Sequence, residues 1–213
     1  MSDQFKNAAG LEPEQATLQT ACFHPMGTVI EFKKEEIEQS IPDRFEKIVR
    51  LFPDRLAVKT GNHSVTYNEL NRAANRIARA ILTSQGQGSE PIALLFENGI
   101  DVIAAIFGVL KTGKFFVILD PSLPSSRLAY LLNDSQARLA ITNTHNLDLA
   151  LIRSSHSGPV LNVDEITESF SADNVGLRLT PDSLVTIVYT SGSTGQPRGV
   201  AQNHLVNMHN ALL

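Results

Sequence analysis

Leu184-Val-Thr-Ile-Val-Tyr-Thr190 is followed directly by Ser191-Gly-Ser-Thr-Gly-Gln-Pro-Arg-Gly199, and these two stretches are the most informative part of the sequence. The first is rich in Val, Ile and Tyr, which predicts a buried β-strand. Thr190 to Gly199 then form ten residues with three glycines, four hydroxyl side chains, one proline and one arginine. Glycines let backbone N–H groups approach a ligand closely, and successive N–H groups in such a loop form an anion-binding concavity. The pattern therefore predicts a strand that leads into a polyphosphate-binding loop.

Two other motifs do not fit this segment, and a flexible Ser/Gly surface turn is the simpler alternative. A Walker loop requires G-x-x-x-x-G-K-[ST], but neither Gly192 nor Gly195 has a glycine five positions later. A nucleophile elbow requires G-x-S-x-G, and no glycine pair here encloses a serine in that way. The residues predicted to contact the phosphates of ATP are Thr190, Ser191, Gly192, Ser193, Thr194, Gly195, Arg198 and Gly199.

Tyr189-Thr-Ser-Gly-Ser-Thr-Gly-Gln-Pro-Arg-Gly-Val200 resembles the phosphate-loop signature of the adenylate-forming superfamily. That superfamily comprises acyl-CoA synthetases, luciferases and the adenylation domains of nonribosomal peptide synthetases. One position differs, because the family usually has lysine where this chain has Arg198. Two further stretches resemble the first two core motifs of peptide-synthetase adenylation domains: Val65-Thr-Tyr-Asn-Glu-Leu-Asn-Arg-Ala-Ala-Asn-Arg-Ile-Ala-Arg-Ala80 and Gly108-Val-Leu-Lys-Thr-Gly-Lys-Phe-Phe-Val-Ile-Leu-Asp-Pro121. The amino-acid-adenylating branch is therefore the most similar.

This resemblance implies an ATP-dependent ligase reaction. In the family, an amino acid carboxylate attacks the α-phosphate of ATP, which carries Mg²⁺, and gives aminoacyl-AMP and pyrophosphate. Phosphopantetheine on a peptidyl carrier protein then takes the acyl group. The loop steadies the β- and γ-phosphates, and His204 falls where the family often has a histidine at the pocket edge.

The family's later residues, among them an acidic Mg²⁺ residue and a catalytic lysine, have no counterpart up to Leu213. The resemblance thus implies no catalytic and no metal-binding residue within this chain. It predicts an N-terminal part of an adenylation domain that is inactive alone and needs the remainder of the domain. A non-catalytic nucleotide- or partner-binding remnant is the alternative.

The composition is that of an ordinary globular protein, with 42% hydrophobic and 19% charged residues. A net charge of −4 argues against nucleic acid as a partner. The single cysteine, Cys22, excludes an internal disulfide framework and is compatible with a reducing compartment. Residues 1–20 lack the apolar core of a secretory signal, and the longest apolar run, 102–110, is far shorter than the ~20 residues of a membrane span. We therefore expect a cytoplasmic protein that binds no membrane.

Strands alternate with helices along the middle of the chain. Apolar runs at 91–96, 115–119 and 137–141 predict strands, and 99–111 and 125–133 predict helices. This alternation predicts an α/β fold with parallel βαβ sheet layers, which the resemblance identifies as an incomplete N-terminal part of the adenylate-forming large domain. We expect residues 1–36 to be a leader with a solvated charged run at 31–36, and 37–213 to be the adenylation domain.

Several shorter elements are also predicted. Ser40 caps one helix, and Thr66 and Glu69 form the capping box of a second helix that ends at Gly86. The remaining expectations are strands at 56–59 and 64–65, an edge strand at 161–163, and loops at 143–146 and 154–158.

Three charged residues of the second motif, Lys111, Lys114 and Asp120, could be taken as catalytic. They fall at predicted helix and strand ends, where charges are ordinarily solvated, so we expect a structural role. His204 and His209 are five residues apart and therefore do not share a helix face as i, i+4 metal ligands would.

Overall fold

A six-stranded sheet lies at the centre of the computed structural model, which describes residues 32–147, 158–191 and 197–212. Its strand order is β6-β5-β3-β4-β7-β8, and every neighbouring pair is parallel except β7 and β8. The strands are β3 (Pro91–Leu95), β4 (Phe115–Leu119), β5 (Leu139–Thr142), β6 (Val160–Asn162), β7 (Leu184–Ser191) and β8 (Pro197–Asn203). The predicted parallel α/β sheet and the predicted edge strand at β6 are confirmed.

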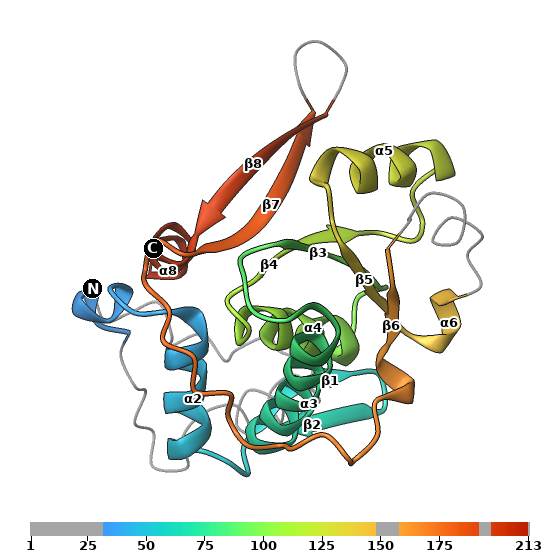
Figure 1. The fold of residues 1–213 in the computed structure, drawn as a ribbon. Coiled ribbons are helices and arrows are strands. Elements are labelled where there is room, and N and C mark those ends of the chain that lie inside the picture. Colours follow the sequence, from blue (N-terminus) through green and yellow to red (C-terminus); the bar gives the residue numbers. More distant parts are fainter. Residues whose placement is uncertain (1–31, 148–157, 192–196, 213) are drawn as a thin grey trace, which may run out of the picture.

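Helices cover both faces of this sheet (Figure 1). On one face α2 (Ile41–Leu51), α3 (Tyr67–Gln85) and α4 (Ile100–Leu110) pack on alternate strand residues such as Leu94 and Phe116. On the other face α5 (Ser125–Ser135) packs on the residues between them, such as Leu95 and Val117. Because successive side chains of a strand point to opposite faces, the continuous apolar runs of β3 and β4 contribute side chains to two separate hydrophobic cores.

The first helices begin where their capping residues predict. The Asp43 N–H donates to the Ser40 hydroxyl at 3.1 Å ahead of α2. At the start of α3 the Glu69 N–H donates to Thr66 Oγ1 at 3.2 Å, and the Thr66 N–H donates to Glu69 Oε2 at 2.8 Å. These are the reciprocal bonds of a capping box. Gly86 ends α3 with φ of 66°, a backbone conformation that glycine adopts without strain.

The short elements differ from expectation in one place. β1 (Leu56–Thr60) and β2 (His63–Thr66) confirm the predicted strands at 56–59 and 64–65, and the structure pairs them antiparallel. Residues 143–146 were predicted to be a loop, but Thr144–Leu147 form the short helix α6. The Asn146 N–H donates to the Asn143 side chain at 3.2 Å, and such an Asn cap starts a helical turn that has no apolar period of its own. Most of the predicted loop at 154–158 lies outside the described residues.

The predicted leader meets the folded domain earlier than expected. Residues 1–31 lie outside the described part, while Lys34–Ile37 form the 3₁₀ turn η1. Glu36 bonds to Lys47 and, at 2.7 Å, to Arg44 of α2. The bond from Lys47, together with the Lys33 N–H and the Arg44 charge, lowers the pKa of Glu36 to about 2. The prediction that the charged run at 31–36 is solvated was therefore wrong for Glu36.

The C-terminal elements are η2 (Val163–Glu165), the β7–β8 hairpin and α8 (His204–Leu212). A long segment without regular structure connects η2 to β7 and passes along α3 (Figure 1). No helix within the described ranges is both long and apolar enough to cross a membrane.

Candidate functional site

The predicted phosphate loop lies at the end of the β7–β8 hairpin. β7 extends through Thr190 and Ser191, and β8 begins at Pro197, so that Ser191 and Pro197 are paired. Gly192, Ser193, Thr194 and Gly195 lie outside the described residues. The sequence predicted one loop over the whole of 190–199, and that interpretation was wrong at both ends.

β8 was missed because its residues oppose strand formation locally. Pro197 cannot donate to a ladder and Gly199 weakens a strand, so neither predicts one. β8 is an edge strand of the described sheet, where a proline is tolerated. Pairing with β7 therefore decides its conformation.

Thr190 and Arg198 are direct partners in the hairpin register. Both side chains are exposed. Directly opposed residues on antiparallel strands lie on the same face with their Cβ atoms about 5 Å apart. A hydroxyl donor and a guanidinium thus share one face beside the ends of both strands. This is a suitable arrangement for an anion, because a guanidinium presents several N–H donors in a fixed plane.

The same face of the hairpin is apolar closer to the sheet. Ile118 of β4, Val188 of β7 and Val200 of β8 are each between 41 and 48% exposed, and Val188 is paired with Val200.

Gly199 is paired with Tyr189 on the opposite face. A Cβ atom at Gly199 would lie 2.8 Å from Ile187 Cγ2 and 3.3 Å from Tyr189 Cε1. Both are closer than ordinary van der Waals contact. The missing side chain therefore leaves room for the Tyr189 ring across β8. Gly199 was predicted from the sequence to contact phosphate, and the structure adds this packing requirement.

A cavity of about 350 Å³ adjoins the hairpin. β4 and β7 share only the register pair Phe116 and Thr186, so their carboxyl-terminal halves are not laddered together. The space between them is lined by apolar residues that include Leu123 and Leu131, with Asp120 and Arg127 as charged members. Ligands of open α/β sheets bind outside the carboxyl ends of the strands, and this cavity and the hairpin end both lie on that side of β4.

His204 lies at the other end of β8. β8 has seven residues, and a strand rises about 3.3 Å per residue, so His204 is roughly 20 Å from the hairpin end. It is 1% exposed, and its Nδ1 accepts from the Ile41 N–H at 3.1 Å. Burial lowers its pKa to about 4, although the Asp43 charge opposes this. The pocket-edge role of His204 stays a prediction.

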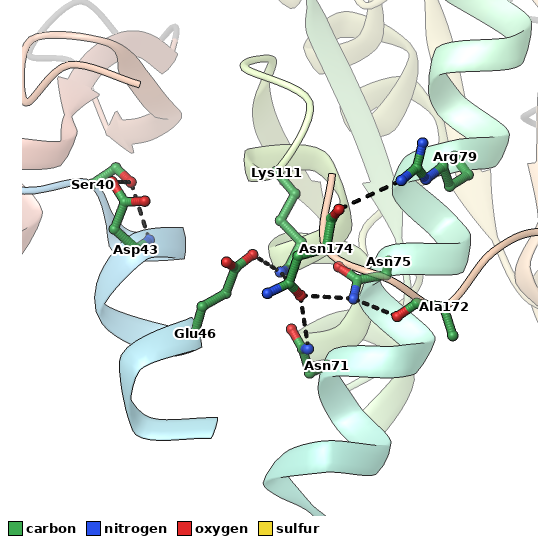
Figure 2. Close-up of polar contacts among 9 residues, drawn as sticks. All are labelled: Ser40, Asp43, Glu46, Asn71, Asn75, Arg79, Lys111, Ala172 and Asn174. Carbon is green, nitrogen blue, oxygen red and sulfur yellow. Dashed lines mark hydrogen bonds and ion pairs between the residues drawn. The ribbon is translucent and has the colours of Figure 1, made fainter. Parts of the chain in front are cut away.

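Lys111 is a buried ion-pair partner. Its side chain is 1% exposed, and its ammonium bonds to Glu46 of α2. It also lies 3.5 Å from Asn174 Oδ1, an atom that accepts from Asn71 and Asn75 of α3 at 3.0 Å each (Figure 2). Burial lowers the pKa of Lys111, and Glu46 partly offsets this. The expectation that Lys111 is solvated was wrong, because its partner is on a helix packed over it.

Lys114 and Asp120 also have structural partners. Lys114 is fully buried and bonds to Glu90, so the prediction of a solvated charge was wrong for it as well. Asp120 Oδ1 accepts from the Ser122 N–H at 2.8 Å, which closes the turn after β4. Within the described ranges, no three His, Cys, Asp or Glu residues gather in a way that could hold a metal ion.

The comparisons with known proteins agree with the fold. The model of the AMP-binding enzyme family matches residues 45–213, so this chain belongs to that family of adenylate-forming enzymes. Among curated relatives, bacitracin synthase 1 of Bacillus licheniformis is 34% identical over 172 residues, which is 80% of this chain and 3% of that protein. Tyrocidine synthase 1 of Brevibacillus parabrevis is 34% identical over 182 residues, or 80% of this chain and 17% of that protein.

A solved structure adds a match in three dimensions. The nonribosomal peptide synthetase FmoA3, in a form bound to α-methyl-L-serine-AMP, superposes with a TM-score of 0.68 at 27% identity, over 78% of this chain and 18% of that one. The similarity is to the adenylation domains of nonribosomal peptide synthetases. The chain thus spans less than a fifth of the length of these relatives.

Proposed function

We propose that this chain supplies the phosphate-binding part of an amino-acid adenylation domain. In the complete domain a carboxylate oxygen of the amino acid bonds to the α-phosphorus of ATP. The bond from that phosphorus to the oxygen bridging to the β-phosphate breaks, which gives aminoacyl-AMP and pyrophosphate. A phosphopantetheine thiol of a peptidyl carrier protein then takes the acyl group and releases AMP. Family membership and the likeness to FmoA3 with its bound aminoacyl-AMP support this reaction class.

The observation that carries the proposal is the pairing of Thr190 with Arg198 beside the ends of β7 and β8. Negative charge develops on pyrophosphate as it leaves, so donors fixed beforehand at that position lower the barrier. Each such donor contributes about 3 kcal/mol in enzymes where one has been removed. Arg198 keeps the positive charge of the family's usual lysine but offers a planar fork of donors. We expect it to bind the β- and γ-phosphates.

Mg²⁺ belongs to the proposal only as an ion carried by ATP. The described residues contain no group of three His, Cys, Asp or Glu that could hold it. No step is therefore assigned to a metal ligand of this chain. The 213 residues alone are not expected to complete adenylation, because none of them is assigned the family's catalytic lysine or Mg²⁺ carboxylate.

Calorimetric titration of the chain with Mg·ATP and with pyrophosphate tests the phosphate site. Arg198→Ala should weaken both affinities at least about tenfold, because a charge-assisted contact is lost, while Arg198→Lys should retain most of the affinity. Arg72→Ala, which removes an exposed arginine of α3, is the matched control and should change neither. An unmodified chain that binds neither ligand, or an Arg198→Ala variant equal to Arg72→Ala, would contradict the proposal.

Amino-acid-dependent exchange of pyrophosphate into ATP tests the second part. Across a panel of amino acids we expect no exchange by the 213 residues alone. Turnover above the enzyme-free background would show that the site is complete without further residues.

A further inference from the structure

One face of α5 is bonded to the far half of the β7–β8 hairpin. The Tyr130 hydroxyl donates to the Pro197 carbonyl at 3.0 Å, and the Tyr189 hydroxyl donates to Asp134 Oδ2 at 2.7 Å. Tyr130 and Asp134 are four residues apart on α5 and therefore lie on the same side of the helix. We call Tyr130, Asp134 and Tyr189 the α5 clamp.

The two bonds hold the two strands of the hairpin separately. Pro197 is the first residue of β8 and is paired with Ser191, the last residue of β7. Tyr189 lies two residues before Ser191 and is paired with Gly199. The clamp thus fixes both strands within two residues of their ends, directly beside Thr190 and Arg198.

The rest of the molecule gives this half of the hairpin little other polar support. β7 pairs with β4 only at Thr186, and beyond that point the hairpin leaves the sheet (Figure 1). In the described ranges, the side-chain hydrogen bonds that join 187–200 to other elements are the two that α5 makes. The position of the strand ends therefore depends on α5 rather than on the sheet.

Two features favour the clamp as it is built. Gly199 has no side chain, and a Cβ atom there would lie 2.8 Å from Ile187 Cγ2 and 3.3 Å from the Tyr189 ring, which therefore packs across the glycine. Burial raises the pKa of Tyr189 above its ordinary value, and the hydrogen bond and negative charge of Asp134 raise it further. The phenol therefore remains protonated and keeps donating to the carboxylate.

We infer that Tyr130 and Asp134 are positioning residues that hold the phosphate-binding hairpin through the Pro197 carbonyl and the Tyr189 hydroxyl. This inference rests on the proposed function, because the hairpin is the part that binds ATP. The contacts that carry the inference are made to the hairpin. They determine where Thr190 and Arg198 are presented, and their loss should weaken phosphate binding while the fold persists.

Hydrogen–deuterium exchange of the full chain without nucleotide tests the clamp directly. Tyr130→Phe and Tyr189→Phe keep the rings but remove one bond each, so the amides of 187–191 and 198–200 should exchange about fivefold faster or more. The amides of β3 and β4 should be unchanged. Tyr67→Phe, which removes a hydroxyl from a ring that packs on Phe45, is the matched control. Equal hairpin exchange in all three variants would overturn the inference.

Titration with Mg·ATP and pyrophosphate tests whether the clamp affects phosphate binding. Tyr130→Phe and Asp134→Ala should weaken binding about five- to tenfold, with thermal midpoints close to that of the unmodified chain. Asp134→Asn keeps an oxygen that can accept from Tyr189 and should restore the affinity. A thermal midpoint that falls with the affinity, or no rescue by asparagine, would reduce these residues to a merely structural role and overturn the inference.

The two proposals fail in different ways. If the unmodified chain binds neither ATP nor pyrophosphate, the proposed function is overturned, and with it the role of the clamp in phosphate binding. If the chain binds ATP but removal of the clamp bonds leaves both exchange and affinity unchanged, only the clamp is overturned.

Discussion

The layer formed by α2, α3 and α4 is attached to the sheet in a different way from the β7–β8 hairpin. The layer buries a continuous apolar core and adds polar bonds through Lys111 and Asn174. The far half of the hairpin has one neighbouring helix, two tyrosine hydrogen bonds and an exposed apolar face. One region is held by many contacts at once, and the other by few.

Because of this difference, we expect substitutions in the helical layer to change the stability of the domain, and substitutions in the hairpin to change mainly phosphate binding. Removing a polar partner in the helical layer should lower the free energy of unfolding of the whole domain, because it leaves a buried group unsatisfied. Removing a contact from the hairpin should increase local opening of the hairpin only, because regions with few buried contacts open without global unfolding. The predictions below test this contrast, in order of decreasing expected effect on the free energy of unfolding.

Glu46→Gln should produce the largest loss. It leaves the ammonium of the buried Lys111 side chain without its carboxylate, and breaking a buried ion pair costs about 3–5 kcal/mol. Because Glu46 itself is 17% exposed, we expect the lower end of that range. Urea unfolding at neutral pH measures it. Glu168→Gln removes an ion pair whose carboxylate is 92% exposed and should change the free energy of unfolding by less than about 1 kcal/mol. Equal losses in the two variants would contradict the contrast.

His204 should make stability depend on pH. Its pKa falls from an ordinary 6.5 to about 4 in the folded state, so the unfolded chain binds more protons between these values. The stabilisation is therefore fully present above pH 6.5 and is lost as pH falls toward 4, by at most about 3 kcal/mol. His204→Asn keeps an acceptor for the Ile41 N–H but cannot titrate, so it should flatten the profile. His145→Asn, at an exposed position, is the control and should leave the pH dependence of the free energy of unfolding unchanged. The same pH dependence in His204→Asn would contradict the assignment to His204.

Gly108→Ala should destabilise the contact between α3 and α4. A Cβ atom there would lie 2.6 Å from Ile77 Cγ2 and 3.1 Å from the Ala74 carbonyl oxygen. Overpacking of this kind costs about 1–3 kcal/mol, partly offset because alanine favours a helix interior more than glycine does. A net loss of about 1–2 kcal/mol is expected in urea unfolding. Gly99→Ala, with no atom within 4 Å of the new Cβ, is the control and should be near neutral. A Gly108→Ala variant more stable than the unmodified chain would contradict the prediction, because it would show that α3 and α4 can move apart without cost.

Gly199→Ala should have the smallest effect on unfolding and a clear effect on binding. The added Cβ atom would displace Ile187 or Tyr189 within a hairpin whose far half has few other contacts. We expect a loss below about 1 kcal/mol in the free energy of unfolding but about tenfold weaker ATP binding, given the proposed function. Titration and urea unfolding of the same variant measure both. A large loss of stability with unchanged affinity would reverse the assignment of the two regions.

Local patterns were enough to predict most of the fold. The Ser40 cap, the Thr66–Glu69 capping box and the stop at Gly86 each involve residues within a few positions of one another. The apolar runs of β3 and β4 alternate with helices in a way that leaves a parallel sheet as the compact solution. For the site, the sequence predicted phosphate contacts over residues 190–199, and the structure places Thr190 and Arg198 face to face.

The order and type of the elements follow from local sequence, because caps, apolar periods and glycines act over one or two turns of chain. Three contacts required the packed fold: Lys111 with Glu46, Tyr130 with Pro197, and His204 with the start of α2. These partners are 65, 67 and 163 residues apart. Their contacts exist only once separate elements have packed, so no local pattern could have encoded them.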